Sequence, residues 1–347
     1  MEKILTKDNI IKFIKKFMPL IGIIILIYIL YAIGIDDILS ALGKLKDSPI
    51  HIIVAVVLTL PRILLRNLQW QFLLKQQKIF VSYIKSLKIF LIGYFYGAIT
   101  PGYAGGLMRV PYLKEETNEP TGKLFVNVFV LSAVNTLLLY FMAVLGAFVI
   151  ARQKLPETFI IEPDLIPLIA CIVLVVQVSI YLYFLKRERG MKVLNFLLKI
   201  VFNKKLQSLF KRFIKTFYDD FPDLRGFIVP LLISIPCWII MYSQIYILGL
   251  PMGIAKVPYF DFILLYAIAN IISVIPITSG GLGIRELTLI TLFGAYGVEA
   301  NVAVVLGLVG HLITDVLTGL YGLVISFFEA KNNKKDISEI KNIFDDP

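Results

Sequence analysis

Charged residues, cysteine and histidine are scarce in this sequence. Asp, Glu, Lys and Arg make up 17% of the 347 residues, whereas hydrophobic residues make up 58% and the mean hydropathy is +0.82. So few charges exclude an ordinary soluble domain. The two cysteines, Cys171 and Cys237, lie within apolar runs, so neither a disulfide framework nor a thiolate metal site is supported. We expect both to be packing residues, and we expect no cofactor.

Long apolar runs occupy much of the chain. They lie at residues 18–35, 124–150, 165–185, 227–250 and 302–328. Each run reaches or approaches the roughly 20 residues that cross a bilayer as a helix, and a backbone in lipid must satisfy its own hydrogen bonds. The sequence therefore predicts an all-α fold, a polytopic transmembrane helical bundle. Because the first run lacks a small-residue cleavage site, we expect a retained anchor rather than a cleaved signal peptide.

The positive charges are gathered in three stretches. The formal net charge is +11, and Lys and Arg concentrate in residues 1–17, 62–88 and 186–225. By the positive-inside rule these stretches face the cytoplasm, which explains the charge without a nucleic-acid partner. We therefore expect a multi-pass protein of the cell membrane, with a cytoplasmic N-terminal tail (1–17), one transmembrane domain (18–329) and a cytoplasmic C-terminal tail (330–347).

Residues 186–225 form the longest candidate segment outside the membrane. Eleven Lys or Arg lie among apolar residues at near-helical spacing, a pattern typical of an amphipathic helix on an anionic leaflet. Forty residues are too few for a catalytic domain. We therefore expect a basic cytoplasmic surface segment here.

A shorter apolar run, residues 89–100, precedes a helix-breaking sequence. Its twelve residues would extend only about 18 Å as a helix, which is too short to cross the bilayer. The sequence "TPGYAGGLMR" at 100–109 then disfavours a continuous helix, because it contains Pro101 and three glycines. A broken, re-entrant hairpin over 86–113 fits the length, and it keeps residues 186–225 on the cytoplasmic side.

A second break lies in "PITSGGLGIRE" at 276–286, within a segment that spans 260–297. This segment is either a second re-entrant hairpin or two full spans, and the number of crossings does not distinguish them. The two breaks resemble each other, "ITPGYAGGLMR" at 99–109 and "ITSGGLGIR" at 277–285, and three spans separate them. The pattern predicts an inverted repeat of the kind found in transporters. The alternative is two tight turns at the membrane surface.

Each break ends in an arginine, Arg109 or Arg285. A charge at mid-bilayer costs at least about 3 kcal/mol, so it should face a cavity, a partner charge or a bound anion. Free backbone amides beside an arginine form an anion site, and the natural anion in a membrane is a lipid phosphate. The glycines expected to free those amides are Gly105, Gly106, Gly280, Gly281 and Gly283. The alternative is that the arginines snorkel to the nearer interface.

Other charged residues lie in or near the predicted spans. Glu286 could pair with Arg285 or Arg109, carry a proton, or simply stabilise a helix N-terminus. His311 and Asp315 stand four residues apart and share a helix face, where they could relay protons or tie helices together. Arg62 and Arg66 also share a face, which we place just cytoplasmic of a second span near 51–65, either where a lipid enters or as a surface anchor.

These motifs resemble a known family. "PITSGGLGIRE" is similar to the PxTPGGxGxRE signature of the lysylphosphatidylglycerol synthase transmembrane region, also called flippase-like. "PGYAGGLMRVPYLKE" at 101–115 and "RILLRNLQWQFLL" at 62–74 resemble two earlier segments of that family. The resemblance covers roughly residues 15–330. Ser279 stands where the family usually has proline, and "LSAVNTLL" at 131–138 lacks a charged pair often present there.

The resemblance implies a bundle that moves a lipid between leaflets, sometimes fused to a lipid-modifying enzyme. The matching functional positions are Arg109, Gly280, Gly281, Gly283, Arg285 and Glu286. We expect a flippase or facilitator for an anionic or phosphate-bearing lipid, either a phospholipid or a polyprenyl phosphate. The alternatives are an embedded lipid-modifying enzyme, which the presence of only two histidines disfavours, and a non-catalytic partner that presents lipid to a separate synthase. Expected partners are anionic membrane lipids, such an enzyme, and further copies of the chain in a homo-oligomer.

Overall fold

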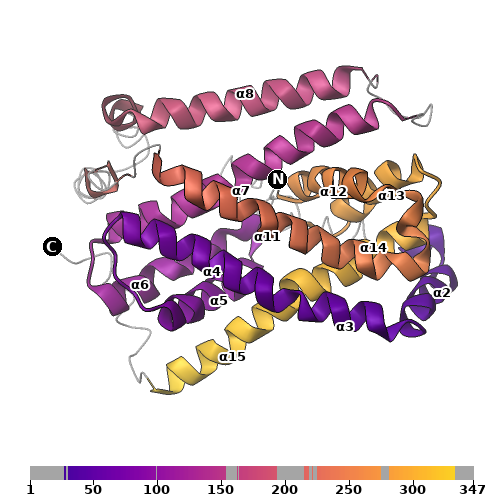
Figure 1. Cartoon of the computed structure of the whole chain (residues 1–347), viewed down its shortest axis with the longest axis horizontal. Coiled ribbons are helices and arrows are strands. Elements are labelled where there is room, and N and C mark those ends of the chain that lie inside the picture. The colour runs from indigo at the N-terminus through magenta and orange to yellow at the C-terminus, as the bar shows by residue number, and fades with distance from the viewer. Residues whose placement is uncertain are drawn as a thin grey trace, which may run out of the picture.

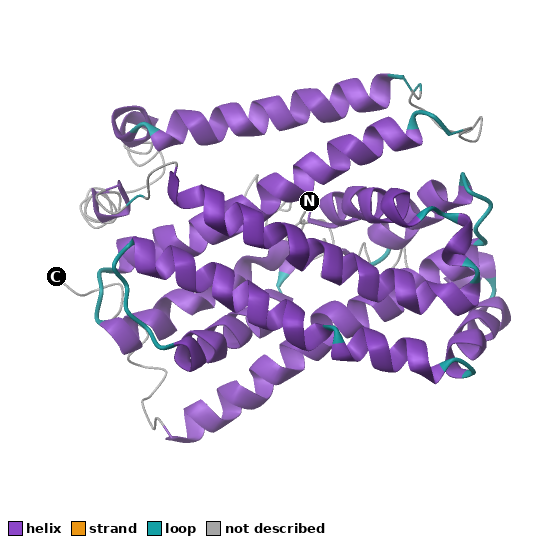
Figure 2. Ribbon diagram, viewed as in Figure 1, coloured by secondary structure: helices purple, strands orange, loops and turns teal. Residues whose placement is uncertain are grey.

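The computed structural model describes residues 27–28, 30–98, 100–153, 162, 164–193, 215–218, 221, 225–274 and 281–332. Every regular element in these ranges is helical (Figures 1 and 2), so the predicted all-α class is confirmed. The N-terminal tail, residues 194–214 of the basic segment, and the chain beyond residue 332 lie outside the described residues, as does most of the first predicted span.

Twelve α-helices of the described residues position the site. They are α2 (Ile35–Lys46), α3 (Pro49–Val57), α4 (Thr59–Gln76), α5 (Tyr83–Ala98), α6 (Arg109–Thr117), α7 (Thr121–Ile150), α8 (Leu165–Leu185), α11 (Arg225–Gly249), α12 (Tyr259–Val274), α13 (Ile284–Gly294), α14 (Ala300–His311) and α15 (Leu317–Asn332). A 3₁₀ segment, Pro101–Met108, joins α5 to α6, and a π-helical turn, Leu312–Val316, joins α14 to α15.

Within the described ranges, five helical stretches are long and apolar enough to cross a membrane. They are Pro49–Gln76, Thr121–Ile150, Leu165–Phe184, Gly226–Met252 and Ala300–Ser326. Four of them match predicted spans. The second span, expected near 51–65, is longer than predicted, because α3 and α4 together run to Gln76. Arg62 and Arg66 therefore lie within a span and not just beyond its cytoplasmic end.

Two helical hairpins are broken at the predicted glycine-rich sequences. In the first, α5 has 16 residues and the returning helix α6 has nine. In the second, α12 has 16 residues and α13 has 11. Sixteen residues extend about 24 Å and eleven extend about 17 Å, less than the hydrocarbon core. None of these four helices is long enough to cross the membrane along its normal.

The two hairpins pack in equivalent ways. The long arm α5 lies along α15, and the long arm α12 lies along α7, while α4 lies along α11. Glycines permit both close contacts: a Cβ added at Gly322 of α15 would lie 2.0 Å from the Leu91 carbonyl oxygen, and one at Gly146 of α7 would lie 2.6 Å from that of Leu264. The long arm of each hairpin thus packs against a long helix from the other half of the chain.

The hairpins also lie toward opposite ends of the molecule. Figure 1 shows α5 and α6 in the half of the bundle where α15 ends, and α12 and α13 in the other half. Buried apolar side chains form one cluster around each hairpin, the first including Trp70 and Phe90 and the second including Phe262 and Phe293. Helix α8 lies on the outside of the bundle beside α7 (Figure 1).

Candidate functional site

Arg285 and Glu286 form a buried ion pair where α13 begins. Gly283 precedes the helix with a φ of 85°, a conformation that favours glycine. One Glu286 oxygen, Oε2, accepts the Gly283 backbone N–H at 2.6 Å, and Oε1 accepts Arg285 Nη2 at 2.8 Å. Glu286 is fully buried and Arg285 is 2% exposed. Glu286 therefore forms its ion pair with Arg285 and not with Arg109, the other arginine considered as its partner.

His311 and Asp315 meet at the π-helical turn. His311 Nδ1 lies 3.0 Å from Asp315 Oδ2 and 3.4 Å from Arg285 Nη1. The other Asp315 oxygen accepts the Tyr94 hydroxyl of α5 at 2.8 Å. The predicted shared face of His311 and Asp315 is confirmed. Single-turn π-helices often occur at functional sites, and this one links the charges of both hairpins.

Arg62 lies inside the protein and not on its exposed surface. The side chain is 3% exposed, and its Nη2 donates to the Thr314 carbonyl at 2.7 Å and to Thr318 Oγ1 at 2.9 Å. The Nε of Arg62 has no hydrogen-bond partner. The hydroxyl and carbonyl groups that hold it come from the far end of the chain, so the sequence around Arg62 does not reveal them.

Arg66, one helical turn later, is half-buried where α4, α7 and α11 meet. It donates to the side chains of Asn135 and Ser234, and its guanidinium carbon lies 4.8 Å from the centre of the Trp238 ring. This is a cation–π contact. Arg66 is therefore also an interior residue rather than a surface anchor.

Arg109 is the first residue of α6 and stacks between aromatic rings. Its guanidinium carbon lies 4.4 Å from the Phe90 ring centre and 5.7 Å from that of Trp70. The Trp70 ring is held in turn by Asn127, whose Oδ1 accepts the indole N–H at 2.7 Å. Gly93 makes room for Arg109, because an added Cβ would lie 2.3 Å from Arg109 Cγ. Arg109 is 8% exposed and its Nε has no hydrogen-bond partner.

Neither break arginine reaches the surface of the bundle, which argues against snorkelling. Together with their neighbours they form one group, which we call the central cluster. Its members are Arg62, Arg66, Tyr94, Arg109, Arg285, Glu286, His311 and Asp315. Tyr94 connects the two sides of the cluster: its hydroxyl donates to Asp315 at 2.8 Å and reaches the Thr314 carbonyl that Arg62 also contacts, and its ring lies 6.1 Å from that of Phe90, against which Arg109 packs.

The central cluster contains more positive than negative charge. It has four arginines and two carboxylates, an excess of two when His311 is neutral. Arg285 pairs with Glu286, whereas Arg62, Arg66 and Arg109 form no ion pair with a carboxylate in the part of the chain that the structure covers. Uncompensated buried cations are unfavourable. The arrangement can therefore accept an anion.

The backbone amides of the breaks contribute less than predicted. The Gly105 N–H donates to Thr100 Oγ1 at 2.7 Å and the Gly283 N–H donates to Glu286 at 2.6 Å, so neither is free and this part of the prediction is wrong. Gly281 has a φ of 73° and packs against Ser273, and an added Cβ at Gly106 would meet nothing within 4 Å. Gly280 lies outside the described residues. Arginine side chains therefore dominate the anion-binding capacity.

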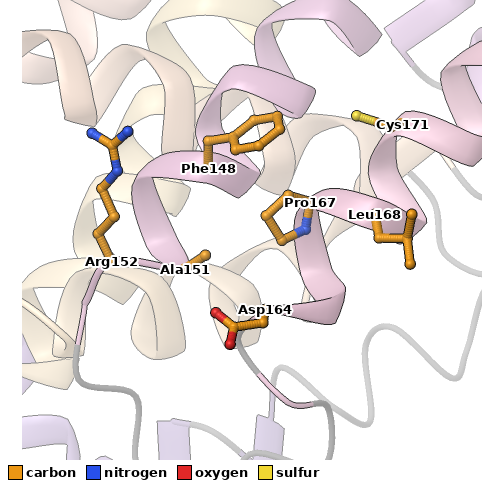
Figure 3. Close-up of a pocket in the computed structure, with 7 residues that line it drawn as sticks. All are labelled: Phe148, Ala151, Arg152, Asp164, Pro167, Leu168 and Cys171. Carbon is orange, nitrogen blue, oxygen red and sulfur yellow. The ribbon is translucent and has the colours of Figure 1, made fainter.

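A separate hollow lies between the end of α7 and the start of α8 (Figure 3). Its volume is about 450 Å³, and its lining residues are Phe148, Ala151, Arg152, Asp164, Pro167, Leu168 and Cys171. None of them belongs to the central cluster. Among the residues that the structure describes, no three His, Cys, Asp or Glu side chains are grouped as metal ligands would be.

Comparison with known proteins shows to which family the chain belongs. The sequence profile of the lysylphosphatidylglycerol synthase TM region matches residues 18–322. The chain belongs to this family. The resemblance seen in its motifs is thereby confirmed, and the protein is an integral, multi-pass membrane protein.

Archaeal relatives match along nearly their whole length. A UPF0104 membrane protein of Methanothermobacter thermautotrophicus is 25% identical over 320 residues, which cover 86% of this chain and 88% of the relative. One from Pyrococcus horikoshii is 23% identical over 344 residues, covering 93% and 99%. One from Methanocaldococcus jannaschii is 23% identical over 320 residues, covering 88% and 92%.

Sequence reasoning missed several residues that position the family signature. Tyr94, Asn135, Ser234 and Trp70 all contact the arginines or their partners. The signal that could have found Asn135 and Ser234 is a polar side chain inside an apolar run, since such residues face the bundle interior and seek partners. Asn135 lies in the segment noted for lacking a charged pair, and there it serves as an uncharged partner for Arg66.

Proposed function

We propose that the protein moves an anionic, phosphate-bearing lipid between the two leaflets, and that the lipid head group binds in the central cluster. The observation that supports this most directly is the excess of buried arginine over buried carboxylate. A bound phosphate would offset that excess, by one charge for a phosphodiester and by up to about two for a phosphate monoester. The hydrocarbon tails of the lipid would stay in the bilayer while the head group passes through the protein.

Arg109 is the best placed phosphate contact. Its guanidinium carbon lies 4.4 Å from the Phe90 ring centre and 5.7 Å from that of Trp70, and it forms no ion pair with a carboxylate of the described residues. A guanidinium presents paired N–H donors that match two oxygens of a phosphate. Arg285, by contrast, already has Glu286 as its partner. In this proposal Arg285 is a secondary contact, which holds the geometry of the second break.

The proposed transport uses the repeated architecture. We take the hairpins at 86–113 and 260–297 to be re-entrant and to form an inverted repeat, with both chain termini in the cytoplasm. In support, the long arms have equal lengths and each packs against a long helix of the other half. In transporters of this kind one repeat rocks against the other around a central site. Such motion would expose the central cluster to one leaflet and then to the other.

Lipid exchange in vesicles tests the proposal. Purified protein reconstituted in liposomes should accelerate the transfer of a labelled phosphatidylglycerol or polyprenyl phosphate between leaflets. Arg109→Ala should slow the exchange about tenfold or more, the effect of losing about 1.4 kcal/mol of head-group binding. Arg152→Ala is the matched control, because Arg152 is an exposed arginine outside the central cluster.

Other outcomes would favour the other functions. Unchanged exchange with every anionic lipid, at verified insertion, would contradict a transport role. Recovery of the labelled lipid in a chemically altered form would indicate an embedded lipid-modifying enzyme. Stable co-purification with a lipid synthase, together with no exchange by the protein alone, would indicate a partner that presents lipid.

A further inference from the structure

One ring nitrogen in the central cluster, Nδ1 of His311, faces both a hydrogen-bond acceptor and a hydrogen-bond donor. His311 Nδ1 lies 3.0 Å from Asp315 Oδ2 and 3.4 Å from Arg285 Nη1. A carboxylate only accepts hydrogen bonds and a guanidinium only donates them. Nδ1 can donate to Asp315 when it carries a proton, or accept from Arg285 when it does not. It cannot satisfy both groups at once: the imidazolium and the neutral Nδ1–H tautomer donate to Asp315, whereas the neutral Nε2–H tautomer accepts from Arg285.

Charged and titratable groups surround this ring from every helix packed there. They are Arg285 and Glu286 of α13, Asp315 of the π-helical turn, Tyr266 of α12, Tyr94 of α5, Arg62 of α4 and Tyr242 of α11. The two carboxylates in this set accept hydrogen bonds at both oxygens. Glu286 accepts hydrogen bonds from Arg285 and from the Gly283 N–H. Asp315 accepts hydrogen bonds from the hydroxyls of Tyr94 and Thr314, and its Oδ2 also faces His311 Nδ1.

Histidine is the member of this set best suited to gain and lose a proton near neutral pH. Its ordinary pKa is about 6.5, whereas ordinary carboxylates are ionised and ordinary phenols are protonated there. Protonating Glu286 would break its pair with Arg285, and protonating Asp315 would remove an acceptor from Tyr94. A proton on His311 instead strengthens the contact with Asp315 and adds positive charge to the cluster.

The charge of His311 also affects the arginine that lies beyond Asp315. Arg62 interacts electrostatically with Asp315 and hydrogen-bonds to the carbonyl of the neighbouring Thr314. A protonated ring holds Asp315 and leaves Arg62 uncompensated. When the ring is neutral, it no longer supplies a positive charge beside Asp315, and Asp315 still interacts electrostatically with Arg62. Deprotonation therefore lowers the positive charge that is available to an anion.

We infer that His311 is a proton-binding site coupled to the anion site, so that one proton and one anionic head group bind together and cross together. The inference rests on the proposed function, and it adds the energy source. By linkage, an anion that binds more tightly to the protonated protein must also raise the affinity for the proton. A proton gradient across the membrane would then drive net movement of the lipid.

Tryptophan fluorescence can report binding close to the arginines. The chain has two tryptophans: Trp70 lies 5.7 Å from the Arg109 guanidinium carbon, and Trp238 lies 4.8 Å from that of Arg66. The probe is a short-chain phosphatidylglycerol, a phosphodiester whose own charge stays constant between about pH 5.5 and 8, the range in which an ordinary histidine titrates. Titrations of the full-length protein in detergent at several pH values give its affinity.

We expect the affinity for phosphatidylglycerol to rise about tenfold as the pH falls through the histidine range, about 1.4 kcal/mol. His311→Gln should bind with an affinity that does not change with pH. The matched control is His51→Gln, because His51 is the second of the two histidines and lies in α3, outside the cluster. This control should retain the pH dependence of the native protein.

A calorimetric measurement on the native protein avoids dependence on variants. The heat of binding in the middle of the pH transition, compared between buffers of different ionisation enthalpy, counts the protons taken up, and we expect about half a proton per lipid, the most that a tenfold change in affinity allows. Binding without proton uptake, or with the same affinity at every pH, would overturn the coupling and leave the anion site intact. Absence of binding at every pH would overturn both the coupling and the proposed function.

Discussion

The two broken hairpins have the same architecture but different charge chemistry. Each has a 16-residue arm, a glycine-rich break and a short returning helix with an arginine in its first turn. In the second hairpin the next residue is Glu286, which neutralises Arg285. In the first hairpin the next residue is Val110, and Arg109 stacks on aromatic rings without a carboxylate. Similar breaks therefore do not imply similar roles.

The difference assigns separate tasks to the two arginines. Glu286 caps α13 through the Gly283 N–H and also pairs with Arg285, so the second break is closed by its own side chains. Gly307 of α14 leaves the space that Glu286 occupies, since an added Cβ would lie 2.7 Å from Oε1. Arg109 has no such partner. The charges of the second hairpin thus pair with each other, whereas the first hairpin carries the arginine that we propose as the phosphate contact.

Glu286→Gln should have the largest effect on stability. It removes the charge from a fully buried carboxylate and so breaks the buried ion pair with Arg285, a change that costs about 3–5 kcal/mol. We expect a clear fall in the thermal unfolding temperature of the detergent-solubilised protein. Arg109→Ala removes an arginine that has no carboxylate partner, so it should lower that temperature much less.

A double variant tests the cause of this loss. Arg285→Met combined with Glu286→Gln leaves no lone charge, so it should be more stable than Glu286→Gln alone. If Glu286→Gln unfolds at the same temperature as the native protein, the contrast between the hairpins is not one of stability.

Val110→Glu should give the first hairpin an adjacent arginine and glutamate, as in the second hairpin. The new carboxylate follows Arg109 as Glu286 follows Arg285, and we expect it to pair with Arg109 and compete with a lipid phosphate. The affinity for short-chain phosphatidylglycerol, measured by tryptophan fluorescence, should fall about tenfold, which corresponds to about 1.4 kcal/mol. Val110→Gln is the control, because it has nearly the same size without the charge. Equal binding by Val110→Glu and Val110→Gln would mean that Arg109 is not the phosphate contact.

The sequence predicted the helical class, four of the spans, both break positions and the shared face of His311 and Asp315. These features are local, because an apolar run, a glycine cluster or a spacing of four residues is visible in a short window. Membership of the family was also visible, since "PITSGGLGIRE" is a contiguous motif.

The sequence did not predict the interior position of Arg62 and Arg66. Both arginines interrupt the apolar run, so the second span seemed to end before them. They are tolerated inside because Thr314, Thr318 and Asn135 supply oxygen atoms from distant helices. Likewise, glycine composition indicated free amides at the breaks, but Thr100 and Glu286 occupy two of them. Such partners become known only when the helices are packed.

Alanine substitutions at two glycines of the first hairpin should differ, by a smaller amount, in their effect on lipid binding. Gly93→Ala places a methyl group where Arg109 Cγ now lies, 2.3 Å from the ideal Cβ position, so the guanidinium must shift off the Phe90 ring. Gly106→Ala adds its methyl group to open space, and it should change the stability by less than about 0.5 kcal/mol. Phosphatidylglycerol titrations should therefore show weaker binding for Gly93→Ala and native affinity for Gly106→Ala. The reverse order would mean that the backbone around Gly106, rather than the arginine stacked beside Gly93, contacts the head group.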